Sequence, residues 1–412
     1  MSEVHDGAVD KMKKIWAILG ATLAIFPNIR YLADLRYRVD PALERSVCRS
    51  LVCSDTVLLD AADRLSLGDK EDKAIAVANL REALRRNVAS PYRWADLGQA
   101  FLNLDQTAEA QYCFMRAVEL GPRIPPILWR TARFYLDIQD INRSQEYLGR
   151  MLEAAPDYKD LVFGLYLSSP RGVVDSFEFG IRRQGRVAQD YFRYLLGHAP
   201  SEDVGKAWSW LQDHSLADSG LAVDYVDFLL KKAQYPLATE IWIRSVGRED
   251  DAYLRPNLVF NGGFEREPLQ GGLDWSFSKI NGVKIRRDST GAFSGSSSLQ
   301  IEFDGAKNID SNLLTHSVVA NPGRHHFRAW VRTSELTTDE GIGFRLVDSS
   351  AQIDLQTARL TGIRDWTPLD LEFTVSGPPR LLRIEVVRQS SQRLDSKIIG
   401  RVWIDDVSLI QK

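Results

Sequence analysis

The sequence predicts a multidomain protein in which an α-solenoid of stacked helix pairs precedes a jelly-roll β-sandwich, with a short hydrophobic anchor at the N-terminus. Three observations lead to this fold class. A helix–turn–helix pattern repeats in the first half, short strands bounded by Gly, Ser, Asn and Asp replace it after about residue 250, and an apolar run lies near the start. We therefore expect domains at 1–40, 41–250 and 251–412.

The composition is that of a folded protein with no affinity for polyanions. The chain has 412 residues, of which 44% are hydrophobic and 26% charged, so it can bury ordinary cores. The formal net charge is −3, and no long basic run with interleaved aromatic residues occurs. Nucleic acid is therefore not an expected partner.

The N-terminus has the layout of a secretory signal. Lys11, Lys13 and Lys14 precede the apolar run 15–26. This run is shorter than the roughly 20 residues that span a bilayer as a helix, but it fits a basic region followed by 7–15 apolar residues. Because no Ala-x-Ala site follows, we predict an uncleaved signal anchor that extends to Leu32 or beyond. The alternative is an amphipathic or buried helix.

The three cysteines do not form a zinc motif. Cys48, Cys53 and Cys113 contain no Cys-x-x-Cys pair and no His cluster lies near them. Cys113 falls within a helical pattern and is expected to be buried. Cys48 and Cys53 form a local disulfide if their segment faces an oxidising compartment, and are otherwise two free thiols.

The most complete unit of the helical repeat begins at Pro91. Small residues stand where two antiparallel helices approach closely, larger ones fill the space between, and a proline ends the second helix. The landmarks are Trp94, Leu97, Gly98, Phe101, Ala110, Phe114, Ala117 and Pro122. Units in the same register begin at Pro125 and near Val57. The spacing resembles the tetratricopeptide repeat (TPR) family, and we predict that 41–250 forms one curved TPR-like stack.

The resemblance implies a concave groove that holds a peptide or a partner protein. The residues expected to be exposed there are Arg93, Asn103, Gln111, Arg130 and Asn142. The alternative for each is an ordinary solvated surface residue.

The second half predicts about eight strands, which is typical of a two-sheet jelly roll. The expected strands are 283–287, 298–303, 312–319, 325–333, 341–347, 367–375, 380–388 and 401–409. Distinctive motifs at 257–265, 294–301, 321–323, 326–332 and 400–409 resemble the galactose-binding-like sandwich of carbohydrate-binding modules. This resemblance implies a polysaccharide ligand.

In such modules a Glu near the start and an Asp near the end often hold a structural calcium together with backbone carbonyls. Glu265 and Asp405 match these positions. The alternative is that both carboxylates make hydrogen bonds or an ion pair without a metal.

The modules also bind sugars on one sheet face. Alternation along 325–333 places His325, Phe327, Ala329 and Val331 on one face and Arg328, Trp330 and Arg332 on the other. The first set fits a core and the second a carbohydrate-binding face, to which we add Arg345 and Glu385. The alternative is that Trp330 packs under a loop. Trp275, Trp366 and Trp403 are expected to serve core or edge packing.

No enzymatic motif is present. The chain has no Gly-rich phosphate loop, no metal-binding helix and no nucleophile elbow, so we expect a protein that is not an enzyme. The hypothesis is a membrane-anchored adaptor that binds a protein partner and a polysaccharide, in exopolysaccharide synthesis or export. The signal-like layout and the sugar-binding resemblance place it at a bacterial inner membrane, facing the periplasm. The alternatives are a pure assembly scaffold and a carbohydrate-active enzyme.

Overall fold

The computed structural model describes residues 54–182, 184–246, 253–254, 256–337, 339–348, 352–393 and 396–412. The expected anchor at 1–40 and the cysteines Cys48 and Cys53 lie outside these residues. The chain divides into two compact units, Met1–Ala188 and Gln189–Lys412. Within the described residues, every helix is too short or too polar to cross a membrane.

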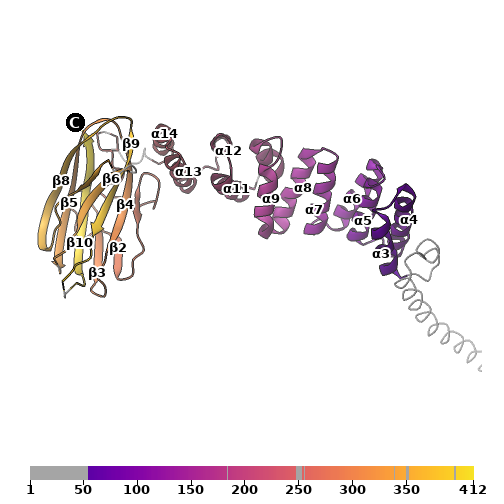
Figure 1. Ribbon diagram of the computed structural model, residues 1–412, viewed down its shortest axis with the longest axis horizontal. Helices are drawn as coiled ribbons and strands as arrows, with labels where there is room; N and C mark the ends of the chain where they lie inside the picture. The colour runs from indigo at the N-terminus through magenta and orange to yellow at the C-terminus, as the bar shows by residue number, and fades with distance from the viewer. Residues whose placement is uncertain are drawn as a thin grey trace, which may run out of the picture. The chain divides into compact units, whose positions relative to one another are not determined.

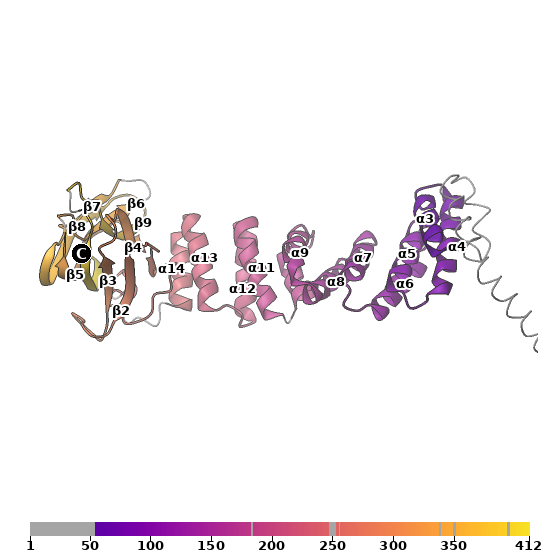
Figure 2. The same ribbon diagram turned by 90° about the horizontal axis from the view of Figure 1, so that it is seen from below.

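The described part of the first unit is helical (Figure 1). Helices that follow one another pack in pairs, α3 with α4, α5 with α6 and α7 with α8 (Figure 2). Their bounds are α3 Asp55–Leu65, α4 Lys70–Arg86, α5 Pro91–Leu102, α6 Thr107–Leu120, α7 Pro125–Asp137, α8 Ile141–Ala154, η2 Pro156–Tyr158, α9 Lys159–Leu167, α10 Val173–Asp175 and η3 Ser176–Ile181.

The repeat landmarks explain how these pairs form. Pro91 and Pro125 occupy the first turns of α5 and α7, where a missing N–H costs nothing. A side chain at Gly98 would approach the Phe114 ring to 3.1 Å, so a small residue is needed where α5 meets α6. Cys113 is buried as expected, and burial raises the pKa of its thiol to about 11.

The second unit contains both helices and strands. The division between the units falls within α11 Gly185–His198, and the second unit also contains α12 Ser201–Asp213, α13 Ser219–Lys231 and α14 Tyr235–Ser245. Asp227 of α13 accepts a hydrogen bond from the backbone N–H of Gly272 at 2.9 Å. The Trp242 ring of α14 covers Gly272 so closely that a Cβ there would clash, and it meets Phe260 edge-on at 5.3 Å. The helical pair α13–α14 is therefore fitted to the start of the β region.

Two antiparallel five-stranded sheets follow, in the orders β1-β4-β9-β6-β7 and β2-β3-β10-β5-β8. We call the second one the β5 sheet; Figure 1 shows its strands side by side. The bounds are β1 Trp275–Phe277, β2 Val283–Asp288, β3 Ser298–Asp304, β4 Ser311–Ala320, β5 Gly323–Leu336, β6 Gly343–Asp348, β7 Asp354–Gln356, β8 Gly362–Val375, β9 Arg380–Arg388 and β10 Ile399–Gln411.

All eight expected strands are present, and two short strands, β1 and β7, were not expected. The predicted alternation along β5 is confirmed. Phe327, Ala329 and Val331 are buried in the apolar core between the sheets, whereas Trp330 is only partly buried on the outer face. Period-two geometry therefore assigned the two faces of this strand correctly.

Candidate ligand-binding surfaces

The outer face of the β5 sheet brings together aromatic side chains from several strands. Residues paired across antiparallel strands point to the same side of a sheet. The pairing of Trp403 with Arg332, and of Asp405 with Trp330, therefore places all four side chains on the outer face. Trp366 of β8 lies beside them, because the Arg332 guanidinium is 5.3 Å from its ring centroid.

A loop residue completes what we call the aromatic cluster: Phe293, Trp330, Trp366 and Trp403. Phe293 stacks on Trp330 with ring centroids 3.9 Å apart and an interplanar angle of 16°. Its centroid is 5.8 Å from that of Trp366. Phe293 itself is 39% exposed, so it forms the outer layer of the cluster. The Trp330 indole points outward as predicted, but Phe293 covers one of its faces.

Sequence reasoning missed part of this cluster. Trp366 and Trp403 are expected to serve core or edge packing, and Trp403 is buried as this expectation requires; Phe293 is not among the residues that the sequence predicts for the binding face. Alternation along β10 could have identified Trp403, because it lies between the core residues Val402 and Ile404. Phe293 lies in a Gly–Ser-rich loop without periodicity, so no sequence signal pointed to it.

The loop that carries Phe293 is held by the two carboxylates predicted to bind calcium. Asp405 Oδ2 accepts hydrogen bonds from the backbone N–H groups of Phe293 (2.7 Å) and Ser294 (3.0 Å). Glu265 Oε1 accepts from Ser296 (2.8 Å) and Ser297 (3.2 Å). Both carboxylates thus hold one loop in place above the β5 sheet.

The environments of the two carboxylates differ. Asp405 is fully buried, and burial raises its pKa to about 6 although backbone N–H groups oppose the shift. Burial also acts to raise the pKa of Glu265, but the hydrogen bonds from Ser296 and Ser297 outweigh it and the pKa is lowered.

This arrangement corresponds to the metal-free alternative of the calcium prediction. The remaining carboxylate oxygens also accept hydrogen bonds, Asp405 Oδ1 from the Asp406 N–H and Glu265 Oε2 from the Ser296 hydroxyl. Donors that point at a carboxylate oxygen compete with a cation for its lone pairs. No group of three His, Cys, Asp or Glu residues suited to a metal occurs within the described ranges. Calcium at Glu265 and Asp405 stays a prediction.

Arg345 and Glu385 do not share a face with Trp330, so the prediction of one five-residue site is wrong. They lie on β6 and β9, which belong to the other sheet. Arg345 pairs with Asp354 at 2.7 Å and with Glu385 at 3.5 Å. The Glu385 side chain is only 2% exposed, so it acts as a buried partner of arginines on that sheet. Only Arg328, Trp330 and Arg332 remain together.

A polar pocket of about 540 Å³ lies at one end of the β5 sheet, and none of the four residues of the aromatic cluster is among its described lining residues. It is lined by Ile280, Asn281, Gly282, Val283, Lys284, Glu302, Phe303, Asp304, Ser334, Glu335, Ile399, Gly400 and Arg401. Arg401 pairs with Glu302 at 3.4 Å and lies two residues before Trp403 on β10. The charged groups of the pocket are therefore two positions away from the aromatic cluster along β10.

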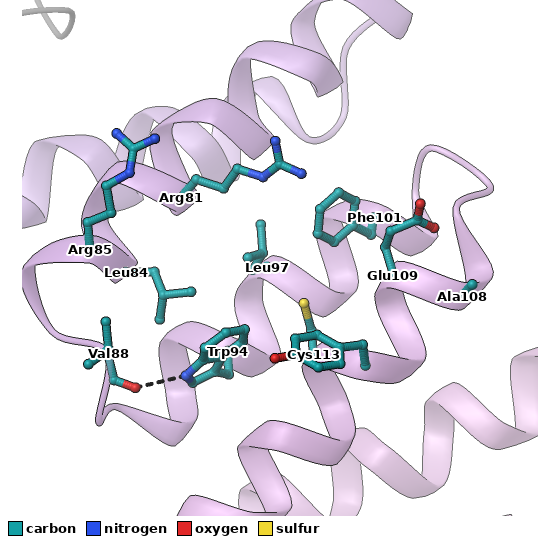
Figure 3. Close-up of a pocket in the computed structure, with 11 residues that line it drawn as sticks. Arg81, Leu84, Arg85, Val88, Trp94, Leu97, Phe101, Ala108, Glu109 and Cys113 are labelled. Atoms are coloured by element: carbon teal, nitrogen blue, oxygen red, sulfur yellow. Dashed lines mark hydrogen bonds between the residues drawn. The ribbon is translucent and has the colours of Figure 1, made fainter.

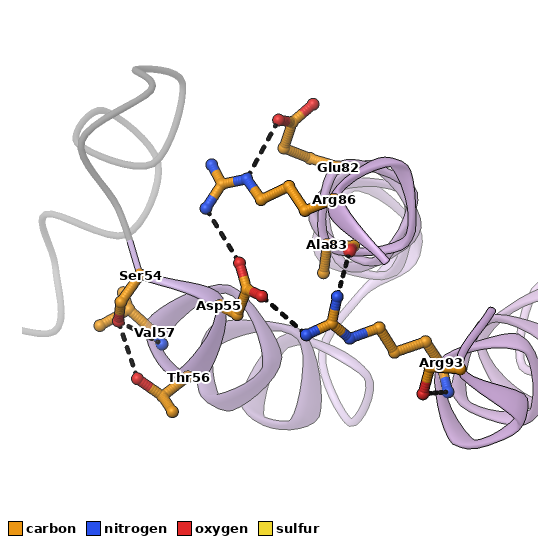
Figure 4. Close-up of polar contacts among 9 residues, drawn as sticks. Ser54, Asp55, Thr56, Val57, Glu82, Ala83, Arg86 and Arg93 are labelled. Carbon is orange, nitrogen blue, oxygen red and sulfur yellow. Dashed lines mark hydrogen bonds and ion pairs between the residues drawn. The ribbon is translucent and has the colours of Figure 1, made fainter. Parts of the chain in front are cut away.

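In the helical part, two of the predicted groove residues are structural. Arg93 donates to Asp55 Oδ2 and to the carbonyl oxygen of Ala83, both at 2.7 Å, and its side chain is 14% exposed (Figure 4). Arg130 donates to Asp96 Oδ1 at 2.6 Å. These pairs join α3 to α5 and α5 to α7. The expectation that Arg93 is an exposed contact is therefore wrong, because its guanidinium is used between helices.

The other three predicted groove residues are also partly buried. Asn103 caps α5 and accepts a hydrogen bond from Gln99 at 3.1 Å, and Asn142 accepts one from Arg171 at 3.3 Å. Gln111 lies half-buried on α6. None of the five lines either of the two helical cavities described next.

The larger helical cavity, which we call the α4–α6 groove, has a volume of about 580 Å³ (Figure 3). It is lined by Arg81, Leu84, Arg85, Val88, Trp94, Leu97, Phe101, Ala108, Glu109, Tyr112 and Cys113. A second cavity of about 430 Å³, which we call the α7–α9 groove, is lined by residues including Trp129, Arg133, Asp137, Gln145 and Leu165. Trp94, a spacing landmark of the repeat, lines the α4–α6 groove.

Comparison with solved structures finds partial similarity. One is the CBM22-1 xylan-binding domain of Paenibacillus barcinonensis Xyn10C, with 17% identity, 36% of this chain and 91% of that chain covered, and a TM-score of 0.25. Another is TmCBM61 in complex with β-1,4-galactotriose, with 16% identity, 38% of this chain and 99% of that chain covered, and a TM-score of 0.26. A third is MamA, with 14% identity, 42% of this chain and 91% of that chain covered, and a TM-score of 0.27. No protein-family model and no curated protein matches the chain. At these TM-scores the similarity adds no argument about ligands.

Proposed function

We propose that this chain is a non-enzymatic adaptor whose outer β5-sheet face binds a polysaccharide and whose helices bind a protein partner. The observation that carries the proposal is the aromatic cluster on an outward sheet face. Aromatic rings packed outside a core form a surface suited to a ligand that is apolar on one side. Sugar rings meet this requirement, because their C–H faces are apolar and their edges carry hydroxyl groups.

Within the cluster we assign the contact to Phe293 and Trp366, with Trp330 as the support beneath. Phe293 covers one face of the Trp330 indole and presents its own ring outward. The Arg332 guanidinium lies 4.3 Å from the Trp403 centroid and 5.3 Å from that of Trp366, and it makes no ion pair within the described ranges. It is therefore positioned to donate hydrogen bonds to a ligand at the edge of the stacking surface.

The polar pocket at the end of the β5 sheet provides the hydrogen-bonding partners that a chain of sugars needs beyond one stacked ring. Glu302 offers hydrogen-bond acceptors and Arg401 offers donors there, and the two side chains form a partly exposed ion pair at 3.4 Å. We propose that successive sugar units extend from the cluster into this pocket. No bond is made or broken in the proposed function.

Binding of the full chain to a glycan array, followed by calorimetric titration with the selected oligosaccharide, tests the sugar proposal. Phe293→Ala should weaken binding by about threefold to tenfold, since one stacked ring contributes about 0.5–1.5 kcal/mol. Ile363→Ala is the matched control, because Ile363 is exposed on β8 outside the cluster. The proposal is excluded if the folded chain binds no glycan on the array, or if the Phe293→Ala variant binds the selected oligosaccharide as tightly as the wild type does.

A pure assembly protein is the second candidate, and one observation favours it. The stacking of Phe293 on Trp330 already satisfies that indole within the chain itself. Under this alternative the aromatic cluster stabilises the β2–β3 loop and both halves bind proteins. Phe293→Ala would then lower the melting temperature of the sandwich, and glycans would bind neither the wild type nor the variant.

Membrane anchoring through 1–40, a periplasmic location and a role in exopolysaccharide synthesis or export complete the proposal. They rest on the basic and apolar pattern of the N-terminal sequence and on the sugar-binding resemblance. Fractionation of cells that express the full chain, with and without residues 1–40, tests the anchor.

A further inference from the structure

The α4–α6 groove combines an apolar floor with a regular helical spacing. Trp94, Leu97 and Phe101 lie on α5 at positions i, i+3 and i+7, so they form a continuous ridge along one helix face. The ridge extends over about 10 Å, since a helix rises about 1.5 Å per residue. This length matches about two turns of a second helix laid into the groove.

Large apolar side chains at the rim of the α4–α6 groove are exposed. Tyr112 of α6 is 64% exposed and Val88, just after α4, is 61% exposed. The Trp94 indole is held between them, because its N–H donates to the Val88 carbonyl at 2.8 Å (Figure 3) and its ring meets Tyr112 edge-on at 5.9 Å. A fixed aromatic floor with an exposed apolar rim is typical of a protein contact surface.

The α4 wall of the groove is positively charged. Figure 3 shows Arg81 reaching from α4 towards Phe101, and its guanidinium carbon lies 5.3 Å from the Phe101 centroid. Among the described residues Arg81 makes no ion pair. Within the part of the chain that the structure describes, Arg85 pairs with Glu82 of its own helix, at 2.9 Å and with 77% of its side chain exposed. On the α6 wall, Glu109 is the charged residue among the described lining residues.

Charge distinguishes this groove from the other candidate surfaces of the helices. In the α7–α9 groove, Arg133 and Asp137 lie one turn apart on α7 and offset each other. Arg93 and Arg130, expected from the sequence to contact a partner, are already paired with aspartates. Of the two helical grooves, the α4–α6 groove is the one in which apolar side chains lie beside an arginine, Arg81, that makes no ion pair among the described residues, with the exposed Arg85–Glu82 pair next to it.

We infer that the α4–α6 groove binds an amphipathic α-helix of a partner protein, whose apolar side chains are flanked by Asp or Glu. Leucine-sized or aromatic side chains of the partner fill the space above Leu97 and Phe101. The partner's carboxylates lie against Arg81 and Arg85. This inference rests on the protein-binding half of the proposed function and gives that half a location and a chemistry.

The test uses the immobilised full chain and a library of random peptides of about 16 residues, enough for about four helical turns. Enriched peptides should carry Leu, Ile, Phe or Trp at helical spacing together with Asp or Glu. Their affinity is then measured by fluorescence anisotropy. Arg81→Glu with Arg85→Glu should raise the dissociation constant by about tenfold or more, since two attractions become two repulsions. Tyr112→Ser should also weaken binding.

Matched controls separate the groove from general effects of charge and exposure. Arg116→Glu with Arg123→Glu makes the same change in net charge outside the groove, and Tyr92→Ser removes an exposed tyrosine of α5 that does not line it. Both should bind the peptides as the wild type does. Circular dichroism checks that each variant keeps its helix content.

Three results would overturn the inference. Enriched peptides without acidic residues, or peptides that bind the groove variants as well as the controls, would place protein binding on another surface and leave the proposed function standing. If the library yields no binder at all, this inference and the protein-binding half of the proposed function both fail, while the glycan titration still decides the other half.

Discussion

Asp405 should make the stability of the β-sandwich depend on pH in a direction opposite to that of an ordinary salt-bridged aspartate. It is fully buried, and it holds the loop that places Phe293 on Trp330. Burial raises its pKa from the ordinary value of 3.8 to about 6. The folded state therefore retains a proton that the unfolded chain has already lost between these two pH values.

The sign and size follow from proton linkage. Because the folded chain binds more protons than the unfolded chain in this window, the free energy of unfolding falls as the pH rises from 3.8 to about 6. The fall is up to about 3 kcal/mol at about 1.4 kcal/mol per pH unit, and it levels off above the folded pKa. Stability contributed by protonated Asp405 is thus present in acid and lost near neutrality.

The perturbation is Asp405→Asn, which keeps the shape but cannot titrate. Unfolding free energies of the full chain from urea titrations, followed by tryptophan fluorescence, are compared with the wild type at several values from about pH 4 to about pH 7. When the unfolding free energy of the variant is subtracted from that of the wild type at each pH, the contributions of the groups that titrate in both proteins cancel. The wild type should lose stability relative to the variant as the pH rises.

Asp406→Asn is the control, since Asp406 is exposed and its positive φ of 46° suits Asn. The charge of Asp406 adds to burial in raising the pKa of Asp405, so Asp406→Asn should reduce the pH dependence of stability without abolishing it. If the difference between Asp405→Asn and the wild type does not change with pH, then burial does not set the charge state of Asp405 and the reasoning is refuted.

Three further predictions concern packing and metal binding. Gly272→Ala should lower the melting temperature by several degrees, because a Cβ would strike Trp242, whereas Gly377→Ala, also at positive φ but in open space, should cost only the backbone strain of about 1 kcal/mol. Arg93→Met should destabilise the helices by about 2–3 kcal/mol, because it removes charge-assisted bonds to Asp55 and the Ala83 carbonyl, as judged by urea unfolding. If calcium binds at Asp405, the melting temperature of the chain should be higher in excess calcium than in a chelator. Equal melting temperatures in the two conditions would mean that Asp405 is held by its hydrogen bonds alone.

Patterns of short range predicted much of this fold. Helical pairs from Pro91 onward and all eight expected strands are present, because amphipathic periods of 3.6 and 2 report which side of an element meets a core. The same period placed Trp330 outward on β5. The repeat spacing also predicts the small residue Gly98, since the close approach of α5 and α6 leaves little room for a side chain there.

Residues whose role depends on distant partners were not predicted. From its position in the sequence Arg93 is expected at the surface, yet its guanidinium donates hydrogen bonds to Asp55 and to the Ala83 carbonyl. Phe293 lies in a loop without periodicity, and only Asp405, 112 residues later, places it on the cluster. In both cases hydrogen bonds between segments far apart in sequence determine the position of the side chain.

By itself the sequence determined the helical half, the β half and the inward and outward sides of β5, because these follow from the repeat distance of a single element. The tertiary structure alone decided which strands share a sheet. Arg345 and Glu385 point outward like Trp330, but β6 and β9 pair in the opposite sheet, so the expected five-residue site divides into two surfaces. Strand alternation is a local property, whereas sheet membership depends on hydrogen bonds between strands that no local pattern encodes.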